Sequence, residues 1–392
     1  MTRKLLTLNA GSSSLKAALF EVDDGLCRRV MKAHADGLGV SPRFTVQDAS
    51  GGTIAQIALT GAEGAFEAVM ARVLAWADST GPGLWAVGHR VVHGGRDHVG
   101  PEQVTSALLL DLDRLCSLAP LHQPHNLAPI RAIAAARPDL PQVACFDTAF
   151  HATMPPVATR FALPRVYEAA GVRRYGFHGL SYDYIAGRLT ELDPVLAAGR
   201  VIVAHLGAGA SLCAMQGGRS IDTTMGFTAL DGLMMGTRCG ALDPGVVLHL
   251  QRQMGLSAEA VEDILYKTSG LLGVSGLSSD MRVLQASDDP HAAEAVELFV
   301  YRIAREAGGL VSSLGGLDGV VFTAGIGENA PEIRAQVCER LAWLGLKIDP
   351  DANLANRPVI SAPHSRVTVR VLPTDEEAMI AAQTLDALAG SD

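Results

Sequence analysis

Hydrophobic and polar positions follow the same arrangement near the start of the chain and again near its middle. In residues 6–17 an apolar run is followed by a turn of glycine and serine residues and by a second apolar run. The same order recurs 197 positions later, in residues 203–214. Two short apolar runs joined by small residues predict a β-hairpin, since glycine lets the backbone turn with a positive φ. The repeat indicates a duplicated fold with two turns whose N–H groups can approach an anion such as phosphate.

Further along the chain, apolar runs alternate with segments of helical spacing. Strands are predicted at 84–88, 142–146, 320–323 and 367–372, and helices at 62–78, 106–118, 126–137, 181–192 and from 376 onward. Residues 246–314 have mostly helical patterning. This alternation favours the α/β class, and Met154, Pro155 and Pro156 indicate a domain boundary.

Composition bounds the class of protein. The length of 392 residues suits two domains, and 48% hydrophobic with 19% charged residues indicates well-filled cores. The net charge of −9 argues against a nucleic-acid surface, which needs a basic patch. The six cysteines include no C-x-x-C pair, so they indicate neither a common zinc module nor a disulfide framework. Without a membrane-length apolar stretch or a signal-peptide pattern, we expect a cytoplasmic protein with no membrane or nucleic-acid partner.

Polar residues in the first hairpin turn are the first candidates for chemistry. The hydroxyl and N–H groups of Ser12 and Ser14, with Lys16 beyond them, are suited to hold a phosphate. Asn9 stands at a strand end, where its amide oxygen can meet a Mg²⁺ ion directly or through water. An ordinary surface turn has the same composition, so the segment alone leaves both interpretations open.

Other candidates are individually weak. Arg90 follows a predicted buried strand and suits either a small anion or a surface carboxylate. Asp147 follows another buried strand, where a helix N-cap is the alternative. His178 is explained as well by a core histidine, and Arg238 by a loop salt bridge.

The segment after the strand at 320–323 gives a stronger signal. Its G-x-G turn precedes a helix start at which Asn329 and Glu332 form a possible capping box. A buried strand, a G-x-G turn and a helix N-terminus together indicate an anion or nucleotide site, although such turns also bind dinucleotides. Glu376 and Glu377 begin the last helix, where they either favour its dipole or supply a metal ligand.

Taken together, these groups predict phosphoryl transfer, which needs phosphate-binding turns, Mg²⁺ ligands and cationic side chains. The chain contains no Walker A motif and no G-x-S-x-G nucleophile elbow. The first strand is not followed by the G-x-G-x-x-G of dinucleotide enzymes, which argues against hydride transfer.

Six motifs lie at residues 9–14, 89–95, 146–151, 174–179, 236–238 and 325–329. In this order they resemble the motifs of the acetate kinase family from one end of the chain to the other. The resemblance implies an actin-like (sugar-kinase) ATPase fold of the α/β class, in which two duplicated RNase H-like domains surround an interdomain ATP cleft. It implies one domain of residues 1–150 with 375–392, a second of residues 151–374, and a homodimer. The family transfers the ATP γ-phosphoryl group reversibly to acetate, giving ADP and acetyl phosphate.

The resemblance also implies roles for individual residues. Catalytic roles fall on Asp147, His178, Arg238 and His122. Substrate binding falls on Arg90 for the carboxylate and on Val92, Leu121 and Phe177 for the methyl group. Nucleotide binding falls on Ser12, Ser14, Lys16, His205, Leu206, Gly207, Ala208, Gly209, Asp280, Met281, Arg282, Gly325, Ile326, Gly327, Glu328 and Asn329. Asn9 and Glu376 would hold Mg²⁺ or Mn²⁺.

Elementary chemistry modifies one of these roles. A simple carboxylic acid is already ionised at pH 7, so acetate needs no general base to attack phosphorus. We therefore expect Asp147 to position an arginine, a Mg²⁺ group or the nucleophile rather than to take a proton. Since two anions must meet, neutralisation of charge is expected to dominate catalysis.

Four positions depart from the family pattern. Ala208 stands where asparagine is frequent, Gln123 replaces a common asparagine, Ala229 replaces a frequent proline and Ala241 a frequent aspartate. The small side chain at 229 can admit a longer acid, and one methylene is worth only about 1–3 kcal/mol of discrimination. A propionate or butyrate kinase of the same superfamily is therefore one alternative function. An actin- or chaperone-type ATPase switch is the other.

Overall fold

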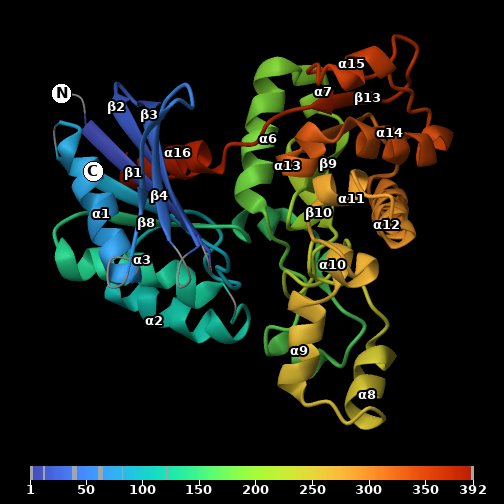
Figure 1. Cartoon of the computed structure of the whole chain (residues 1–392), viewed down its shortest axis with the longest axis horizontal. Helices are drawn as coiled ribbons and strands as arrows, with labels where there is room; N and C mark the ends of the chain where they lie inside the picture. Colours follow the sequence, from blue (N-terminus) through green and yellow to red (C-terminus); the bar gives the residue numbers. More distant parts are fainter. Residues whose placement is uncertain are drawn as a thin grey trace. The chain divides into compact units, whose positions relative to one another are not determined.

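The computed structural model describes residues 3–11, 14–37, 42–60, 65–81, 83–120 and 122–389. Ser12 and Leu121, both predicted site residues, lie outside these ranges. By its internal contacts the chain divides into two compact units, which we call unit 1 (Met1–Phe150 with Asp375–Asp392) and unit 2 (His151–Thr374). Each unit is a β-sheet with helices packed on it, so the predicted α/β class is confirmed (Figure 1).

The strands of unit 1 are β1 (Arg3–Ala10), β2 (Ser14–Asp23), β3 (Leu26–Asp36), β4 (Arg43–Asp48), β5 (Thr53–Ala58), β6 (Leu84–Val91), β7 (Glu102–Gln103) and β8 (Gln142–Phe146). Its helices are α1 (Phe66–Ser79), α2 (Ser106–Arg114), α3 (Gln123–Ala136) and α16 (Glu376–Ala389), with a 3₁₀ turn η2 (Leu115–Ser117). A second 3₁₀ turn, η3 (Ala149–Thr153), spans the boundary to unit 2. Within the described ranges, these strands form one sheet in the order β5-β4-β3-β2-β1-β6-β8-β7.

Strand β1 shows why the sheet is covered on both faces. Leu6 and Leu8 pack with residues of α1 and α3, whereas Leu5 points to the opposite face and packs with α16. This alternation is the two-residue period of a strand. A Cβ at Gly88 in β6 would lie 2.2 Å from the Thr384 hydroxyl oxygen of α16. The close contact of α16 with β6 therefore requires glycine at this position.

Unit 2 contains the strands β9 (Arg200–Leu206), β10 (Ala210–Gln216), β11 (Arg219–Thr223), β12 (Gly319–Thr323) and β13 (Thr368–Val371). Its helices are α4 (Pro156–Thr159), α5 (Arg165–Ala169), α6 (Gly179–Leu192), α7 (Pro194–Ala197), α8 (Pro244–Arg252), α9 (Ala258–Lys267), α10 (Gly270–Ser275), α11 (Met281–Gln285), α12 (Pro290–Leu314), α13 (Ala324–Asn329), α14 (Pro331–Arg340) and α15 (Pro350–Leu354), with a 3₁₀ turn η4 (Ala342–Leu344). All residues of this unit are described, and its five-stranded sheet has the order β11-β10-β9-β12-β13.

Parallel strands bring the candidate residues of each unit to one edge of its sheet. In unit 1, β1 and β8 both run parallel to β6. In unit 2, β9 and β13 both run parallel to β12. The carboxyl ends of parallel strands lie at the same sheet edge, which is the usual place for a ligand site in α/β proteins.

Both predicted hairpins are confirmed. Strands β1 and β2 pair antiparallel up to Ala10 and Leu15, and the N–H of Gly11 donates to the Ser14 carbonyl over 2.8 Å. Strands β9 and β10 pair antiparallel up to Leu206 and Ala210. The chain between these pairs is short in both cases, as small residues in the turns predict.

Two helix starts predicted from capping signals are wrong. Helix α3 begins at Gln123, three residues before Asn126, whose side chain bonds to the end of β1 and to the residue after β6 instead of capping. The G-x-G segment lies inside the short helix α13, and Ala330, not Asn329, is the N-cap of α14. Asn329 donates to the Gly325 carbonyl over 2.9 Å, so its side chain is engaged within α13. Over the described part of the chain, every helix is too short or too polar to span a bilayer.

Candidate functional site

A partly buried cluster of charged and polar side chains lies at the carboxyl edge of the unit 1 sheet. Arg90 of β6 donates from Nε to the Asp147 carboxylate over 2.9 Å and from Nη2 over 2.5 Å. Its Nη1 donates to the Asn9 amide oxygen over 3.1 Å, and the Asn9 amide nitrogen donates to Glu376 over 3.1 Å. We call Arg90, Asn9, Asp147 and Glu376 the Arg90 cluster. Its members come from β6, β1, the end of β8 and the start of α16.

Burial and neighbouring charge act in opposite directions on Arg90. Burial alone would lower the pKa of its guanidinium, but Asp147, Glu376 and Glu377 raise this pKa above its usual value. The Asp147 side chain is only 1% exposed, so its charge depends on this pairing. Arg90 is therefore held as a permanent cation in a fixed orientation. Asp147 holds the guanidinium, and its catalytic role stays a prediction.

Arg90 retains donors for a ligand. A guanidinium carries five N–H groups. Among the described residues, its partners take the Nε hydrogen, one hydrogen of Nη1 and one of Nη2. One N–H on each terminal nitrogen is left, and a guanidinium can bind a carboxylate through two such N–H groups.

Two buried amides support the loops that carry the cluster. The Asn126 amide oxygen accepts from the Val92 N–H over 2.9 Å, and its amide nitrogen donates to the Ala10 carbonyl over 2.7 Å. Gln123 accepts from the His93 N–H over 3.1 Å and donates to the His93 carbonyl over 2.9 Å. Helix α3 thus links the end of β1 with the chain beyond β6. Sequence reasoning missed both supporting roles, although Gln123 was noted as a departure from the family pattern.

The oxygen donors near Arg90 fit a hard divalent cation. Among the described residues, no group of three or more His, Cys, Asp or Glu side chains is arranged to hold a metal by itself. Mg²⁺ commonly takes only one or two protein oxygens and completes its shell with water and phosphate oxygens. Asn9 and Glu376 are already adjacent and offer an amide and a carboxylate oxygen, so their chemistry suits Mg²⁺ in this mode.

Unit 2 places two imidazole rings beside the second hairpin turn. His178 has φ +60° at the N-cap of α6, and its ring stacks on His205 of β9 with 4.2 Å between centroids. A Cβ at Gly209 would lie 3.1 Å from His178 Nε2 and 2.9 Å from Arg238 Nη2. The close approach of both side chains to the turn therefore depends on glycine at 209. Nη1 of Arg238 donates to the Ala229 carbonyl over 2.6 Å, so the departure at 229 leaves the backbone contact in place.

A pocket of about 520 Å³ opens at the carboxyl edge of the unit 2 sheet. Its lining includes eight of the predicted nucleotide-binding residues, namely Gly207, Ala208, Asp280, Met281, Arg282, Gly325, Ile326 and Asn329. Asp280 is the N-cap of α11 and its ion pair with Arg282 lowers its pKa. The pocket therefore assembles three segments that are far apart in the sequence.

The remaining predicted residues lie elsewhere. Lys16 is exposed on β2, in register with Asn9, and Ser14 begins the same strand. His122 is the N-cap of α3, whereas Phe177 of unit 2 is buried with its carbonyl 2.9 Å from His151 Nε2.

Glu328 and Arg334 bind to the backbone of the segment that lines one side of the pocket. One carboxylate oxygen of Glu328 accepts from the Ala324 N–H over 2.8 Å and from the Thr374 N–H over 3.1 Å. Arg334 is fully buried and donates from Nη1 to the carbonyls of Gly327 and Glu328, each over 2.9 Å. Arg334 was not predicted from the sequence, because its position carries no motif signal. Direct nucleotide contact by Glu328 and Gly327 stays a prediction.

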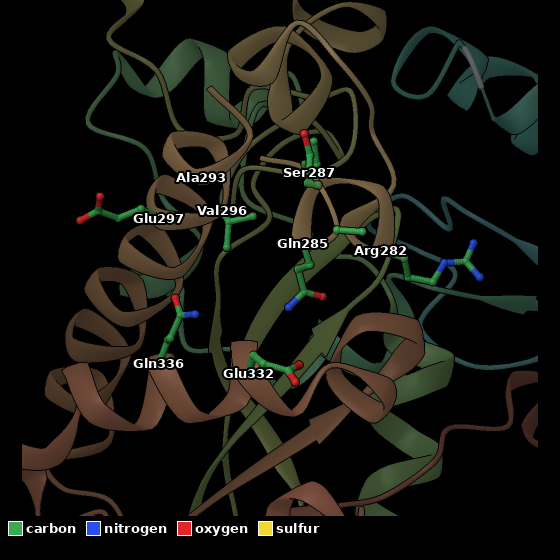
Figure 2. Close-up of a pocket in the computed structure, with 10 residues that line it drawn as sticks. Arg282, Gln285, Ser287, Ala293, Val296, Glu297, Glu332 and Gln336 are labelled. Carbon is green, nitrogen blue, oxygen red and sulfur yellow. The ribbon is translucent and has the colours of Figure 1, made fainter. Parts of the chain in front are cut away.

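A second hollow of about 690 Å³ adjoins this pocket and shares Arg282 and Gln285 with it. Figure 2 shows Gln285 of α11 and Glu332 of α14 around the hollow, while the Arg282 guanidinium points away from its centre. The hollow is lined by α11, α12 and α14 together with the segment between α11 and α12.

The fold, the Arg90 cluster and the residues around the unit 2 pocket identify the class of protein. It is a two-unit α/β phosphotransferase with an actin-like ATPase fold. The chain belongs to the acetokinase family, whose model matches residues 4–382. An acetate kinase of Rhodopseudomonas palustris is 57% identical over 389 residues, covering 97% of each chain.

Solved structures of acetate and propionate kinases are also similar to this chain. The Porphyromonas gingivalis acetate kinase structure superposes with a TM-score of 0.88 at 37% identity, over 98% of this chain and 100% of that chain. A propionate kinase from Francisella tularensis superposes with a TM-score of 0.89 at 34% identity, over 97% of this chain and 98% of that one.

Proposed function

We propose that the chain is an acetate kinase that transfers the γ-phosphoryl group of ATP reversibly to acetate, giving acetyl phosphate and ADP. The observation that carries the proposal is the pair of guanidinium N–H groups that Arg90 keeps for a ligand. A fixed, permanently charged fork suits a small carboxylate, which must be oriented with one oxygen toward phosphorus. The family membership and the acetate kinase named at 57% identity support the same reaction.

The proposed reaction assigns work to both units. In this proposal Arg90 binds the carboxylate, and the family resemblance assigns the methyl group to Val92, Leu121 and Phe177. The nucleotide occupies the 520 Å³ pocket of unit 2. Arg238 neutralises the charge that spreads over the phosphoryl oxygens during direct in-line transfer, and His178 donates a hydrogen bond to these oxygens. Since acetate attacks as an anion, no side chain has to remove a proton from it.

Mg²⁺ is the proposed metal, with Asn9 and Glu376 as its protein ligands and Mn²⁺ as a substitute. When bound, the ion neutralises phosphate charge and helps to orient the phosphoryl group. The Asn9 amide must exchange its bonds to Arg90 and Glu376 for this role. Asn9→Ala should therefore raise the Mg²⁺ concentration for half-maximal activity, which a metal titration at saturating acetate and ATP measures.

The hydroxamate assay for acyl phosphate tests the proposal directly. With ATP, Mg²⁺ and acetate, the protein should form acetyl hydroxamate after hydroxylamine is added, in an amount that matches the ADP produced. Omitting acetate should abolish both products. ADP formation that is independent of carboxylate would contradict the proposal and favour an ATPase switch of the actin or chaperone type.

Propionate kinase activity is the second candidate. The observations that favour it are the likeness to the Francisella tularensis propionate kinase and alanine at position 229. Comparing kcat/KM for acetate, propionate and butyrate decides between the two functions. Because one methylene changes binding by only about 1–3 kcal/mol, we expect propionate to be used, at a lower kcat/KM than acetate.

A homodimer and a cytoplasmic location complete the proposal. Helix α8 has no buried residue, and exposed apolar side chains lie on it and beside it, at Leu242, Val246, Leu248 and Met254. We propose that a second copy of the chain covers this face, so Leu248→Asp should shift the sedimentation coefficient from dimer to monomer.

ATP and ADP are cytoplasmic metabolites, and fractionation of cells tests the location.

A further inference from the structure

The stacked rings of His178 and His205 are each bound to a serine hydroxyl through the same ring nitrogen. His178 Nδ1 lies 2.8 Å from the Ser211 oxygen, and His205 Nδ1 lies 2.8 Å from the Ser181 oxygen. Since a neutral imidazole has one N–H and one lone pair, the bond at Nδ1 decides what Nε2 presents. The hydrogen bond to each serine therefore contributes to the choice of tautomer in its ring.

On the His178 side, a phenol continues the chain of hydroxyl groups. The Tyr182 hydroxyl lies 2.5 Å from the Ser211 oxygen, and both residues are fully buried. Burial raises the pKa of Tyr182, so the phenol keeps its proton. A phenol is a stronger acid than a serine hydroxyl, and imidazole is the strongest base of the three groups. The favoured order runs from Tyr182 to Ser211 and from Ser211 to the lone pair of His178 Nδ1.

The His205 side has the opposite polarity. The Ser181 hydroxyl donates to the Thr374 hydroxyl over 2.8 Å, so its single proton is already used. The Ser181 oxygen is thus an acceptor for N–H at His205 Nδ1. The neighbouring rings consequently carry their protons on different nitrogens.

We propose that Ser211 and Tyr182 are positioning residues that keep the proton of His178 on Nε2, so that the ring donates a hydrogen bond to the phosphoryl oxygens. This inference rests on the proposed function for the identity of the acceptor. Nε2 points to the Gly209 turn, close to Nη2 of Arg238. With the proton on Nδ1 instead, a lone pair would face an anionic group and repel it.

Kinetics of Ser211→Ala test the proposal. The variant should lower kcat about tenfold, as expected for a misdirected hydrogen bond to a charged group, and leave the KM values for acetate and ATP within about twofold. Tyr182→Phe should lower kcat in the same way but less. The double variant should be no slower than Ser211→Ala, because both substitutions interrupt one chain.

Ser220→Ala is the matched control. Ser220 is also fully buried, and its hydroxyl lies 2.8 Å from Nδ1 of another imidazole, that of His151. The kcat of Ser220→Ala should stay within about threefold of that of the unsubstituted protein. An equal loss of kcat in Ser220→Ala, or an unchanged kcat in Ser211→Ala, would overturn the positioning role.

NMR of the imidazole nitrogens provides a readout besides activity. In ¹H–¹⁵N spectra, assigned with His178→Gln and His205→Gln, His178 should be protonated at Nε2 and His205 at Nδ1. Tyr182→Phe should add signal from the other tautomer of His178. A proton on Nδ1 of His178 in the unsubstituted protein would refute the inference, whether or not acyl phosphate forms. Failure of the hydroxamate assay alone would instead refute the proposed function.

Discussion

The two units carry the same hairpin but use it for different chemistry. At matched positions, Asn9 and Lys16 of unit 1 correspond to Leu206 and Cys213 of unit 2. The Asn9 side chain joins a network of ions, whereas Leu206 and Cys213 are fully buried. Helix α12 packs on β10, which explains why an apolar residue replaces lysine there. The backbone of a duplicated element thus persists while the packing around it decides which side chains remain polar.

The charge of the two sites differs as well. The Arg90 cluster of unit 1 combines a guanidinium with carboxylates, and its geometry is set by ion pairs. Beside the turn of unit 2 lie an arginine, stacked imidazoles and serine hydroxyls. We infer that unit 1 binds and orients the small anion, while unit 2 stabilises the charge that moves during transfer.

Removing the cation of unit 2 should have the largest effect. Arg238→Ala should lower kcat by roughly 10³–10⁵, because an arginine aimed at a transferring phosphoryl group is worth this much in comparable enzymes. Arg238→Lys keeps the charge without the fork and should recover only part of the loss. Steady-state kinetics by the hydroxamate assay measure both variants. A near-normal kcat for Arg238→Ala would contradict the inference that unit 2 stabilises the charge that moves during transfer.

Removing the cation of unit 1 should act on binding and stability instead. Arg90→Ala should raise KM for acetate about 100-fold or more, since two charge-assisted hydrogen bonds are lost. It also leaves Asp147 buried without its partner, at a cost of about 3–5 kcal/mol in the free energy of unfolding.

The double variant Arg90→Ala/Asp147→Asn separates the two effects. An amide at 147 should restore much of the unfolding free energy while KM stays high. Kinetics and thermal unfolding of both variants check this. If the double variant also restored KM, Arg90 would act through stability and not through the carboxylate.

Filling the space at the turn of unit 2 should have an intermediate effect. Gly209→Ala introduces a Cβ 2.9 Å from Arg238 Nη2 and 3.1 Å from His178 Nε2. Displacing both groups should lower kcat roughly 10²-fold, as small misplacements of reacting groups do. Gly187→Ala in α6 is the control, because a Cβ at this position meets no atom within 4 Å. Alanine in place of a helical glycine should add about 1 kcal/mol to the free energy of unfolding. Equal activity of the two variants would contradict the placement of His178 and Arg238.

The smallest difference concerns pH. Burial lowers the pKa of His89 and His93 in unit 1 and of His151 in unit 2 to about 4. Unfolded histidine titrates near 6.5, so below this pH the unfolded state binds more protons and stability falls toward pH 4. Each histidine should cost about 2 kcal/mol at pH 5.

Unit 1 has two of these histidines and should lose more stability than unit 2. Trp76 and Trp85 lie in unit 1 and Trp343 in unit 2, so fluorescence of Trp343→Phe follows unit 1 alone. Urea unfolding at pH 7 and pH 5 measures the difference. His89→Gln should reduce the pH dependence of unit 1, and an unchanged dependence would exclude His89 as a source.

Buried strands could be predicted well from the sequence, whereas the long-range contacts of polar side chains could not. The prediction for β8 matches its observed bounds, Gln142–Phe146, because every residue of this strand is buried. The start of α3 was misplaced because Asn126 has a capping side chain, which long-range contacts with Val92 and Ala10 recruit instead. Local patterns carry no information on such contacts.

The site shows the same limit. The resemblance to the acetate kinases indicated most residues that line the unit 2 pocket. Of these, residues 207, 208, 325, 326 and 329 also follow the buried strands β9 and β12 in short runs. Arg334, in contrast, is a charged residue on a helix and reads as exposed, although it is fully buried against the carbonyls of Gly327 and Glu328. A buried arginine of this kind becomes visible only when the carbonyls that it satisfies are placed in space.

The position of α16 has a consequence for the order in which the chain assembles during synthesis. Helix α16 packs on β1 and β6 of unit 1 and supplies Glu376, yet it follows the whole of unit 2 in the chain. While unit 2 is being translated, the apolar face formed by Leu5, Ala18 and Phe20 has no helix to cover it. Unit 2 is continuous and can fold on emergence from the ribosome. We therefore expect unit 1 to mature last, and the face that awaits α16 to be the part of the nascent chain that most needs a chaperone.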